Sequence, residues 1–313
     1  MKAADVFAKD FIETEEGLIF AVVAQGTEQN KVLCFLRYVY KTPCWIKYQT
    51  AEANIFLEQN YPAYLHYSTE LDAHLHAVSA DRIVNHYQPR QRLLQIMQAK
   101  RHDHVEQDVF QLCKWYQQHG LDLSQAGITG SILIGAQQPG SDIDLVCYER
   151  NLFHACRTVT QELISLGQLQ ALNGKDWLQS YERRSCALNL ADYVRHEQRK
   201  YNKAMINARK FDLSFIDLSV NPKPVNYQKC GSITLQSKII DDTRAFDYPA
   251  EYKIDHAHIS SIVSFTATYA GQAINGETVE ASGMLEQTAQ GNKRLVVGSS
   301  REAPGEYIKV VQG

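Results

Sequence analysis

Alternating apolar and polar positions near the start of the chain predict a β-hairpin. Leu18–Ala24 and Lys31–Tyr40 are rich in β-branched, aromatic and aliphatic residues, and the Gly-containing segment 25–30 between them is a turn signal. Thr50–Gln59 follows with a polar start and helical spacing of its apolar residues. The pattern predicts an N-terminal α+β domain over residues 1–95.

The apolar spacing changes to a helical period in the middle of the chain. Arg90–His119 carries an apolar stripe and is expected to break near Arg101–His104. Further helices are expected in three later segments, the last of which runs on toward Arg209 without a clear break: Leu152–Leu166, Asp176–Arg183 and Leu188–Met205. Phe211–Asp217 then alternates as a strand, so residues 96–220 are predicted to form a second domain that mixes strands and helices.

Beyond residue 218 the composition favours strands. Residues 219–226 contain two prolines and two asparagines and are expected to form a linker. Five strand-like runs separated by turn signals follow it: Ser232–Ile240, Ile259–Thr268, Thr278–Leu285, Arg294–Val297 and Tyr307–Val311. The segment 230–313 is therefore predicted to be a small all-β barrel, OB-like or of a related topology, or a sandwich.

One stretch of the second domain carries residues suited to chemistry. Gly130–Ser131 is followed after about ten residues by Asp142 and Asp144, which alternate with apolar residues. Residues two apart on a strand point to the same face, so the two carboxylates are expected to repel each other and to favour a shared cation. Oxygen ligands suit Mg²⁺ or Mn²⁺, usually together with substrate phosphates. A glycine and a hydroxyl suit close approach of a phosphate tail.

This pattern, hydrophobic-Gly-Ser and then Ser141-Asp-Ile-Asp-Leu-Val, resembles the signature of the polymerase-beta-like nucleotidyltransferase superfamily. The superfamily includes small nucleotidyltransferases, CCA-adding enzymes and poly(A) polymerases. The resemblance implies an α+β fold with a mixed-sheet core, metal ligands at Asp142 and Asp144, and contacts of Gly130, Ser131 and Ser141 with a nucleoside triphosphate. The whole chain, including the segment 10–20, is also similar to a mainly archaeal group of predicted nucleotidyltransferases.

The superfamily completes its metal site with a third carboxylate on a later apolar strand, where it helps to bind the second ion and activate the acceptor. Asp212, flanked by Phe211 and Leu213, has this pattern. Asp217 is the alternative, although its place at the exit of the strand is also typical of a solvated turn residue. We expect Asp212 to be the third ligand.

The sequence departs from the superfamily in the turn after Gly-Ser. Many small nucleotidyltransferases have Arg-Ala-Arg-Gly there, and this chain has Ile132–Gly135. Cations for the triphosphate must then come from elsewhere. The segment 195–210 has six basic residues, among them Arg199 and Lys203, which would share a face of a continuous helix. The alternative is an ordinary solvated helix face.

Composition adds few constraints to this picture. The net charge of −3 gives no general attraction to nucleic acid, and residues 230–313 hold seven Lys and Arg against ten Asp and Glu. No apolar run reaches the about 20 residues of a membrane helix, so we expect no membrane association and a cytoplasmic location. The seven cysteines lack Cys-x2-Cys spacing, which disfavours structural zinc.

The combined prediction is a Mg²⁺- or Mn²⁺-dependent transferase. It would move NMP from an NTP to a hydroxyl group of an acceptor, which is RNA, protein or a small molecule. A different class of function fits the missing turn arginines: a nucleotide-binding or nucleic-acid-associated module without efficient transfer.

Overall fold

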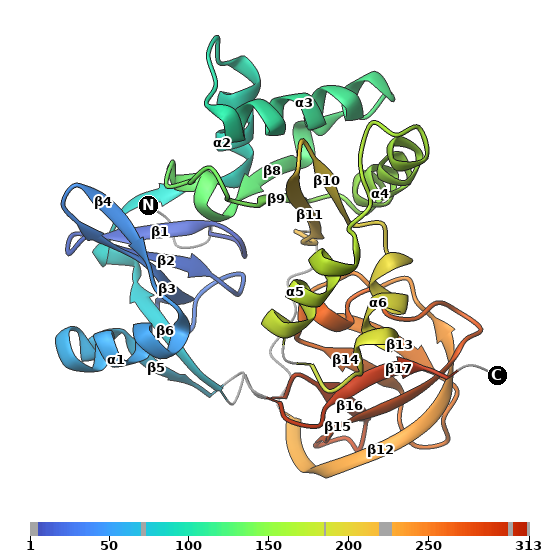
Figure 1. Cartoon of the computed structure of the whole chain (residues 1–313). Helices are drawn as coiled ribbons and strands as arrows, with labels where there is room; N and C mark the ends of the chain where they lie inside the picture. Colours follow the sequence, from blue (N-terminus) through green and yellow to red (C-terminus); the bar gives the residue numbers. More distant parts are fainter. Residues whose placement is uncertain (1–5, 70–72, 185, 219–226, 300–302, 312–313) are drawn as a thin grey trace. The chain divides into compact units, whose positions relative to one another are not determined.

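A computed structural model describes residues 6–69, 73–184, 186–218, 227–299 and 303–311 (Figure 1). These residues form three β-sheets and six α-helices, so the predicted α+β class is confirmed. The expected linker 219–226 lies outside the described residues. Among the helices that are described, none is long and apolar enough to cross a membrane.

The first sheet lies within the N-terminal hundred residues and has the order β5-β6-β3-β2-β1-β7, with β4 pairing to β3. Its strands are β1 (Phe11–Thr14), β2 (Leu18–Val22), β3 (Lys31–Lys41), β4 (Cys44–Lys47), β5 (Leu65–Ser68), β6 (Ala73–Ser79) and β7 (Ile83–Tyr87). The antiparallel pair of β2 and β3 confirms the predicted hairpin. Helix α1 (Thr50–Asn60) confirms the predicted helix, and its buried Ala53 and Leu57 join the sheet's core residues.

Two helices lead into the second sheet, α2 (Pro89–Gln98) and α3 (His104–Gln118). They confirm the predicted break, because the Asp103 side chain caps α3 by accepting hydrogen bonds from the backbone N–H groups of Val105 and Glu106. The start of α2 packs directly on the second sheet at Gly127. A Cβ on Gly127 would lie 2.6 Å from the Cβ of Pro89, so the close packing requires glycine there.

The second sheet holds the motif and has the order β10-β11-β9-β8. Its strands are β8 (Ala126–Thr129), β9 (Ile143–Cys147), β10 (Lys203–Ile206) and β11 (Arg209–Phe215). β11 confirms the predicted alternation, because Phe211 and Leu213 are buried and Asp212 is on the opposite face.

The expected continuous helix over Leu188–Met205, and on toward Arg209, is wrong. Helix α6 (Leu190–Gln198) is short, and β10 begins five residues after its end. Tyr201 has a left-handed φ of 48°, which no helix accommodates, and Asn207 and Ala208 have φ of 48° and 62°. Positive φ at both residues of a two-residue turn is the geometry of a tight hairpin, and it joins β10 to β11.

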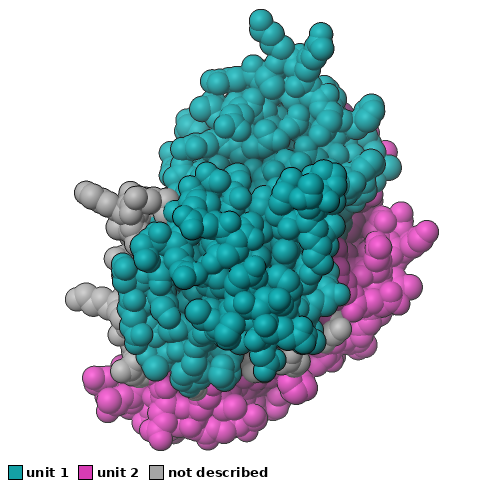
Figure 2. All heavy atoms as spheres, turned by 90° about the vertical axis from the view of Figure 1, so that its left-hand side faces the viewer, with its two compact units in different colours: residues 1–153, 206–213, 218–222 teal, residues 154–205, 214–217, 223–313 magenta. Residues whose placement is uncertain are grey.

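The described chain divides into two compact units, shown in Figure 2. The first contains residues 1–153, 206–213 and 218–222, and the second contains residues 154–205, 214–217 and 223–313. The first unit holds both the N-terminal sheet and the motif. The division into three domains at residues 95 and 220–230 stays a prediction.

The second unit contains α4 (Arg150–Ser165) from His154 onward, α5 (Gly174–Arg184), α6 and the third sheet. The sheet consists of β12 (Tyr227–Asp241), β13 (Ala250–Ile254), β14 (Ser261–Ser264), β15 (Thr278–Thr288), β16 (Lys293–Val297) and β17 (Tyr307–Val310). Five strands pair in the order β12-β13-β14-β16-β15, and β12 pairs again with β15, which closes the ring. The sequence pattern missed β13 but predicted the other five strands. Trp177 of α5 and Tyr193 of α6 share a buried core with Tyr252 of β13.

Candidate functional site

Asp144 lies on β9 with its side chain on the sheet face that carries Thr129. The antiparallel register pairs Thr129 directly with Asp144, and directly opposed residues project to the same side. The neighbours Ile143 and Leu145 are 0% and 3% exposed, so the apolar face of β9 lies in the core, as predicted. The alternation therefore presents the Asp144 carboxylate at the end of β8.

Gly130 closes over this carboxylate. Its φ is +71°, and a Cβ on Gly130 would lie 2.4 Å from Oδ2 of Asp144. Both the left-handed backbone and the close approach exclude a side chain there. The glycine of the motif is thus in direct contact with the second aspartate of the motif.

Asp212 on β11 reaches the same region. β11 neighbours β9 in the sheet, and the negative charge of Asp212 raises the pKa of Asp144. Oδ1 of Asp212 is buried and has no hydrogen-bond partner among the described residues. A buried carboxylate oxygen without a partner is costly in free energy, and a bound cation would compensate for it.

Asp142 lies immediately before β9 and forms an ion pair with Lys210, with 2.9 Å between Oδ2 and Nζ. Lys210 is two residues before Asp212 on β11, so one lysine lies close to both strands that carry the carboxylates. The charge of Asp142 also raises the pKa of Asp144. Asp142 and Asp212 therefore lie close enough to Asp144 for their charges to raise its pKa.

The three carboxylates create a strongly negative site. Burial raises the pKa of Asp144 from 3.8 to about 6, and the charges of Asp212 and Asp142 add to this increase. The ammonium groups of Lys9 and Lys210 oppose it. Asp144 is therefore only partly ionised near pH 6 without an additional cation.

These residues fit a hard divalent cation. Mg²⁺ and Mn²⁺ take carboxylate oxygens and substrate phosphates as ligands, and a partnerless Asp212 oxygen beside Asp144 offers such a donor. Within the described residues, no group of three Asp, Glu, His or Cys side chains is arranged so that it could hold a metal ion by itself. The fit therefore rests on the repulsion among the carboxylates and on the partnerless oxygen.

The Gly-Ser turn brings Ser131 and Ser141 together across ten residues. Ser131 Oγ donates a hydrogen bond to Ser141 Oγ over 3.2 Å, and that oxygen also accepts one from the backbone N–H of Gln138 over 2.9 Å. Gly130–Ile134 forms a 3₁₀ turn that ends at Gly135. The turn thus places both predicted phosphate-binding hydroxyls at one end of the loop before β9.

Two arginines hold this loop in place. Arg92 Nε donates to the carbonyl of Ile132 over 2.9 Å. Arg209 NH1 donates to the carbonyl of Ser141 over 2.7 Å, while its Nε donates to Asp108 Oδ2 over 2.8 Å. Arg209, predicted as part of a basic helix, is instead bound to the loop and to α3.

The departure from Arg-Ala-Arg in the turn has a structural reason. Leu133 is 3% exposed and packs with Phe11, Ile19 and Tyr38 of the N-terminal sheet. Ile134 packs against the same cluster. The turn is therefore an apolar contact between the motif and the first sheet, where an arginine would be buried.

Arg199 and Lys203 do not share a helix face, because α6 ends before them. Arg199 donates two hydrogen bonds to the carboxylate of Glu277. Lys203 pairs with Glu197, a carboxylate that Lys200 binds as well. Both predicted phosphate ligands are thus neutralised within the second unit, and their binding to a nucleotide stays a prediction.

The small residues Gly298 and Ser299 bind the protein's own carboxylate at Glu306. The backbone N–H groups of Gly298 and Ser299 and the Ser299 hydroxyl all donate to Glu306. Asp217, the alternative third ligand, lies two residues beyond the end of β11. Asp212, by contrast, lies within β11.

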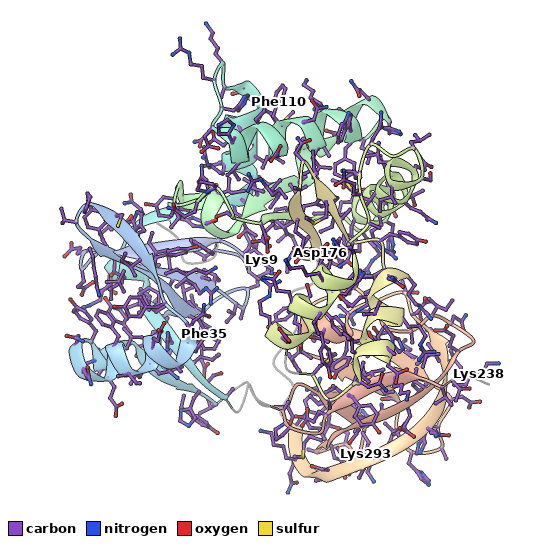
Figure 3. All side chains as sticks on the ribbon, viewed as in Figure 1. Lys9, Phe35, Phe110, Asp176, Lys238 and Lys293 are labelled. Atoms are coloured by element: carbon purple, nitrogen blue, oxygen red, sulfur yellow. The ribbon has the colours of Figure 1, made fainter. Side chains whose placement is uncertain are left out.

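Sequence reasoning missed two residues of the site, Thr129 and Lys9. Thr129 Oγ1 donates to the backbone carbonyl of Lys9 over 2.9 Å. Lys9 lies in the turn before β1 and is labelled in Figure 3. Nothing in the local sequence marks Lys9, because its proximity to Asp144 depends on the docking of the first sheet.

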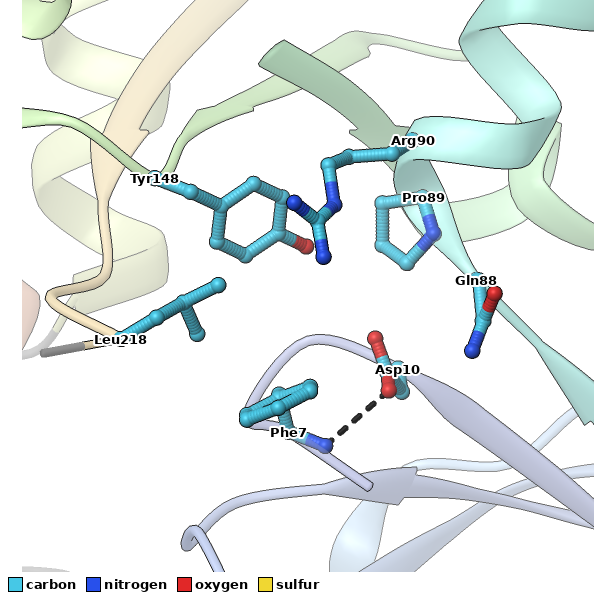
Figure 4. Close-up of a pocket in the computed structure, with 7 residues that line it drawn as sticks. All are labelled: Phe7, Asp10, Gln88, Pro89, Arg90, Tyr148 and Leu218. Carbon is cyan, nitrogen blue, oxygen red and sulfur yellow. Dashed lines mark hydrogen bonds between the residues drawn. The ribbon is translucent and has the colours of Figure 1, made fainter. Parts of the chain in front are cut away.

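A small cavity lies near that turn, lined by Phe7, Asp10, Gln88, Pro89, Arg90, Tyr148 and Leu218 (Figure 4). Its volume of about 20 Å³ accommodates a water molecule but no nucleotide. Asp10 accepts hydrogen bonds there from the Phe7 backbone N–H and from His86 Nε2, over 3.0 and 2.7 Å. Through Asp10, the residues around the cavity help to hold the turn that contains Lys9.

The amino-acid sequence is similar to that of an archaeal protein. It is 31% identical over 343 residues to the uncharacterized protein MJ1086 of Methanocaldococcus jannaschii, covering 96% of this chain and 98% of that protein. No family model and no solved structure matches the chain.

Proposed function

The chain belongs to the family of the archaeal protein MJ1086, and we propose that it is a metal-dependent nucleotidyltransferase. It transfers NMP from an NTP to a hydroxyl group. The observation that carries the proposal is that Asp144, which Gly130 contacts, lies within the charge influence of both Asp142 and Asp212. Carboxylates that repel one another can bind the metal ions of phosphoryl transfer, and a glycine turn beside them lets a phosphate tail approach the backbone.

The arrangement of the second sheet supports a polymerase-beta-like core. β8 leads into the Gly-Ser turn, β9 carries Asp144, and the neighbouring β11 carries Asp212. This placement of the two carboxylates on neighbouring strands supports the resemblance of the motif.

Each residue has a defined role in the proposed reaction. Asp142 and Asp144 would hold Mg²⁺ or Mn²⁺, with Asp212 completing the site. The bound metal would neutralise the triphosphate and stabilise the pyrophosphate leaving group. Asp212 would orient the acceptor hydroxyl through its partnerless oxygen, and Gly130 and Ser131 would position the phosphate tail.

The third sheet supports a nucleic-acid acceptor. Its closed ring has the strand order of OB barrels, in which the third and fifth strands are parallel and the first strand pairs with the fourth. Many OB barrels bind oligonucleotides. This support is a fold analogy, and an RNA or protein acceptor, like a cytoplasmic location, stays a prediction.

A nucleotide-binding module without transfer is the second candidate. It is favoured by the burial of Leu133 where the superfamily has arginines and by the ion pairs of Arg199 and Lys203. Calorimetry would support this candidate by detecting Mg·ATP binding while no acceptor of a broad panel yields pyrophosphate.

Transfer of label from each of the four α-³²P-NTPs to RNA, protein and small hydroxyl compounds tests the primary proposal. We expect labelling by the wild-type protein and loss of more than about 100-fold in Asp144→Asn and Asp212→Asn, because each metal ligand contributes several kcal/mol to the transition state. Asp217→Asn is the matched control and should retain activity. Equal labelling by the wild-type, Asp144→Asn and Asp212→Asn proteins would contradict the assignment.

A further inference from the structure

The turn before β1 holds a lysine in a strained backbone conformation. Lys9 has φ of 80°, a region that side chains with a Cβ rarely adopt. Such conformations persist where the surrounding structure enforces them, and they cluster at functional sites. The strained backbone at Lys9 therefore suggests a role in the function of the neighbouring residues.

Hydrogen bonds on both sides of Lys9 enforce this conformation. The Lys9 N–H donates to the Val22 carbonyl over 3.0 Å, and the Val22 N–H donates to the Asp10 carbonyl over 2.9 Å. The buried Asp10 side chain binds Phe7 and His86 on the other side. The turn is thus fixed to β2 and β7 of the first sheet.

The carbonyl of Lys9 connects this turn to the carboxylate site. It accepts the hydrogen bond of Thr129 Oγ1, and Thr129 is the residue directly opposite Asp144 and directly before Gly130. Opposed residues in an antiparallel pair have their Cβ atoms about 5 Å apart. The Lys9 backbone consequently lies one side chain away from Asp144, and its charge lowers the pKa of that carboxyl.

The first sheet is also joined to the motif by packing. Leu133 of the Gly-Ser turn is buried against Phe11 and Tyr38, and Phe11 begins β1 just after the Lys9 turn. The packing of Leu133 on the first sheet leaves no room for an arginine in the turn. The same packing holds the exposed Lys9 near the motif.

We propose that Lys9 binds the triphosphate of the substrate and supplies the cation that the Gly-Ser turn lacks. This inference deepens the proposed function and rests on it for the identity of the substrate. It assigns to the N-terminal sheet the role of delivering a phosphate-binding residue to the carboxylates. The chemistry that Lys9 recognises is a Mg²⁺-bound polyphosphate, whatever the base.

The test is the binding of Mg²⁺·tripolyphosphate and Mg²⁺·ATP to the full chain, measured by calorimetry. Lys9→Gly removes the ammonium and accepts the left-handed backbone, so it should preserve the fold. We expect its Kd for both ligands to rise about 10- to 100-fold, as for loss of one charge-assisted hydrogen bond. Lys9→Arg should bind within a few-fold of the wild type, because it retains the charge.

Lys100→Ala is the matched control, since Lys100 is an exposed lysine between α2 and α3 of the same unit. Its Kd should be unchanged. Where transfer is measured, Lys9→Gly should raise KM for the NTP more than it lowers kcat.

The outcomes separate the two proposals. Unchanged tripolyphosphate binding by Lys9→Gly, or no tripolyphosphate binding by the wild type, overturns the role of Lys9. Lys9-dependent binding without NMP transfer to any acceptor supports the role of Lys9 and rejects the transferase. Label transfer that is lost in Asp144→Asn but keeps its wild-type KM in Lys9→Gly supports the transferase and rejects the role of Lys9.

Discussion

Replacing Asp212 by asparagine should make the metal-free protein more stable, although it removes a residue of the site. Burial is the largest cause of the raised pKa of Asp144, which moves from 3.8 to about 6. The charges of Asp212 and Asp142 add to this increase. A shift of this size corresponds to about 3 kcal/mol of unfavourable interaction with the ionised half-buried carboxyl. Asp212→Asn removes one contribution to this cost, so the variant should gain part of it, less than the whole shift, at pH 7.5 in EDTA.

Divalent metal should reverse the order of stability. Saturation of the wild type with Mn²⁺ at 100 times its Kd stabilises the folded state by about 2.7 kcal/mol, and the variant should lose most of this gain. Urea denaturation followed by circular dichroism, with EDTA and with Mn²⁺, measures both terms. Asp217→Asn is the control and should respond to Mn²⁺ as the wild type does.

The pH dependence gives the sign of the effect. A folded-state pKa raised to about 6 means that Asp144 costs stability as pH rises through that value, and that it is neutral well below it. The advantage of Asp212→Asn in EDTA should therefore disappear near pH 4.5. The reasoning is refuted if the variant is less stable than the wild type in EDTA at pH 7.5, or if Mn²⁺ stabilises both proteins equally.

Three further changes test the support of the site and of the second unit. Gly130→Ala should destabilise the fold by about 1–2 kcal/mol, because residue 130 has a left-handed φ. It should also weaken Mn²⁺ binding by displacing the Asp144 carboxylate. Ser131→Ala should change the Mn²⁺ affinity little, and calorimetry compares the two variants. Leu133→Ala should cost about 2–5 kcal/mol in urea denaturation, because Leu133 is 3% exposed; a cost below 1 kcal/mol argues against its packing role. Burial lowers the pKa of His196 to about 4, so the free energy of unfolding should fall by about 3 kcal/mol between pH 6.5 and 4. His196→Gln should flatten this decline. An equally steep pH profile in the variant would exclude His196 as its cause.

Local patterns predicted the elements whose own residues determine them. The hairpin of β2 and β3, the break between α2 and α3 and the alternation of β11 all follow from spacing and capping residues. The helix expected through residue 205 is wrong, because helical spacing of apolar residues continues past Tyr201, whose left-handed backbone ends any helix. β13 was missed because its five residues lack a long apolar run.

The same distinction holds at the site. Asp142, Asp144 and Asp212 could be predicted as candidates because motif spacing and strand alternation are local signals. The partners of the cations were not predictable, since Arg209 binds an aspartate 101 positions away and Arg199 binds a glutamate 78 positions away. Charge density in a segment indicates neither which carboxylate a basic residue will meet nor whether its charge remains available.

The apolar turn and the strained lysine are best understood as one change. A triphosphate site needs positive charge near the carboxylates, and an arginine at position 133 would be buried against Phe11 and Tyr38 at high cost in free energy. Docking the first sheet there excludes arginine but brings the Lys9 turn to Thr129. Leu133→Arg should therefore not restore the superfamily pattern: it should separate the first sheet from the motif and weaken tripolyphosphate binding together with stability. Tighter tripolyphosphate binding by a stably folded Leu133→Arg protein would contradict this reasoning. It would show that the turn has lost phosphate-binding arginines and that no residue of the first sheet replaces them.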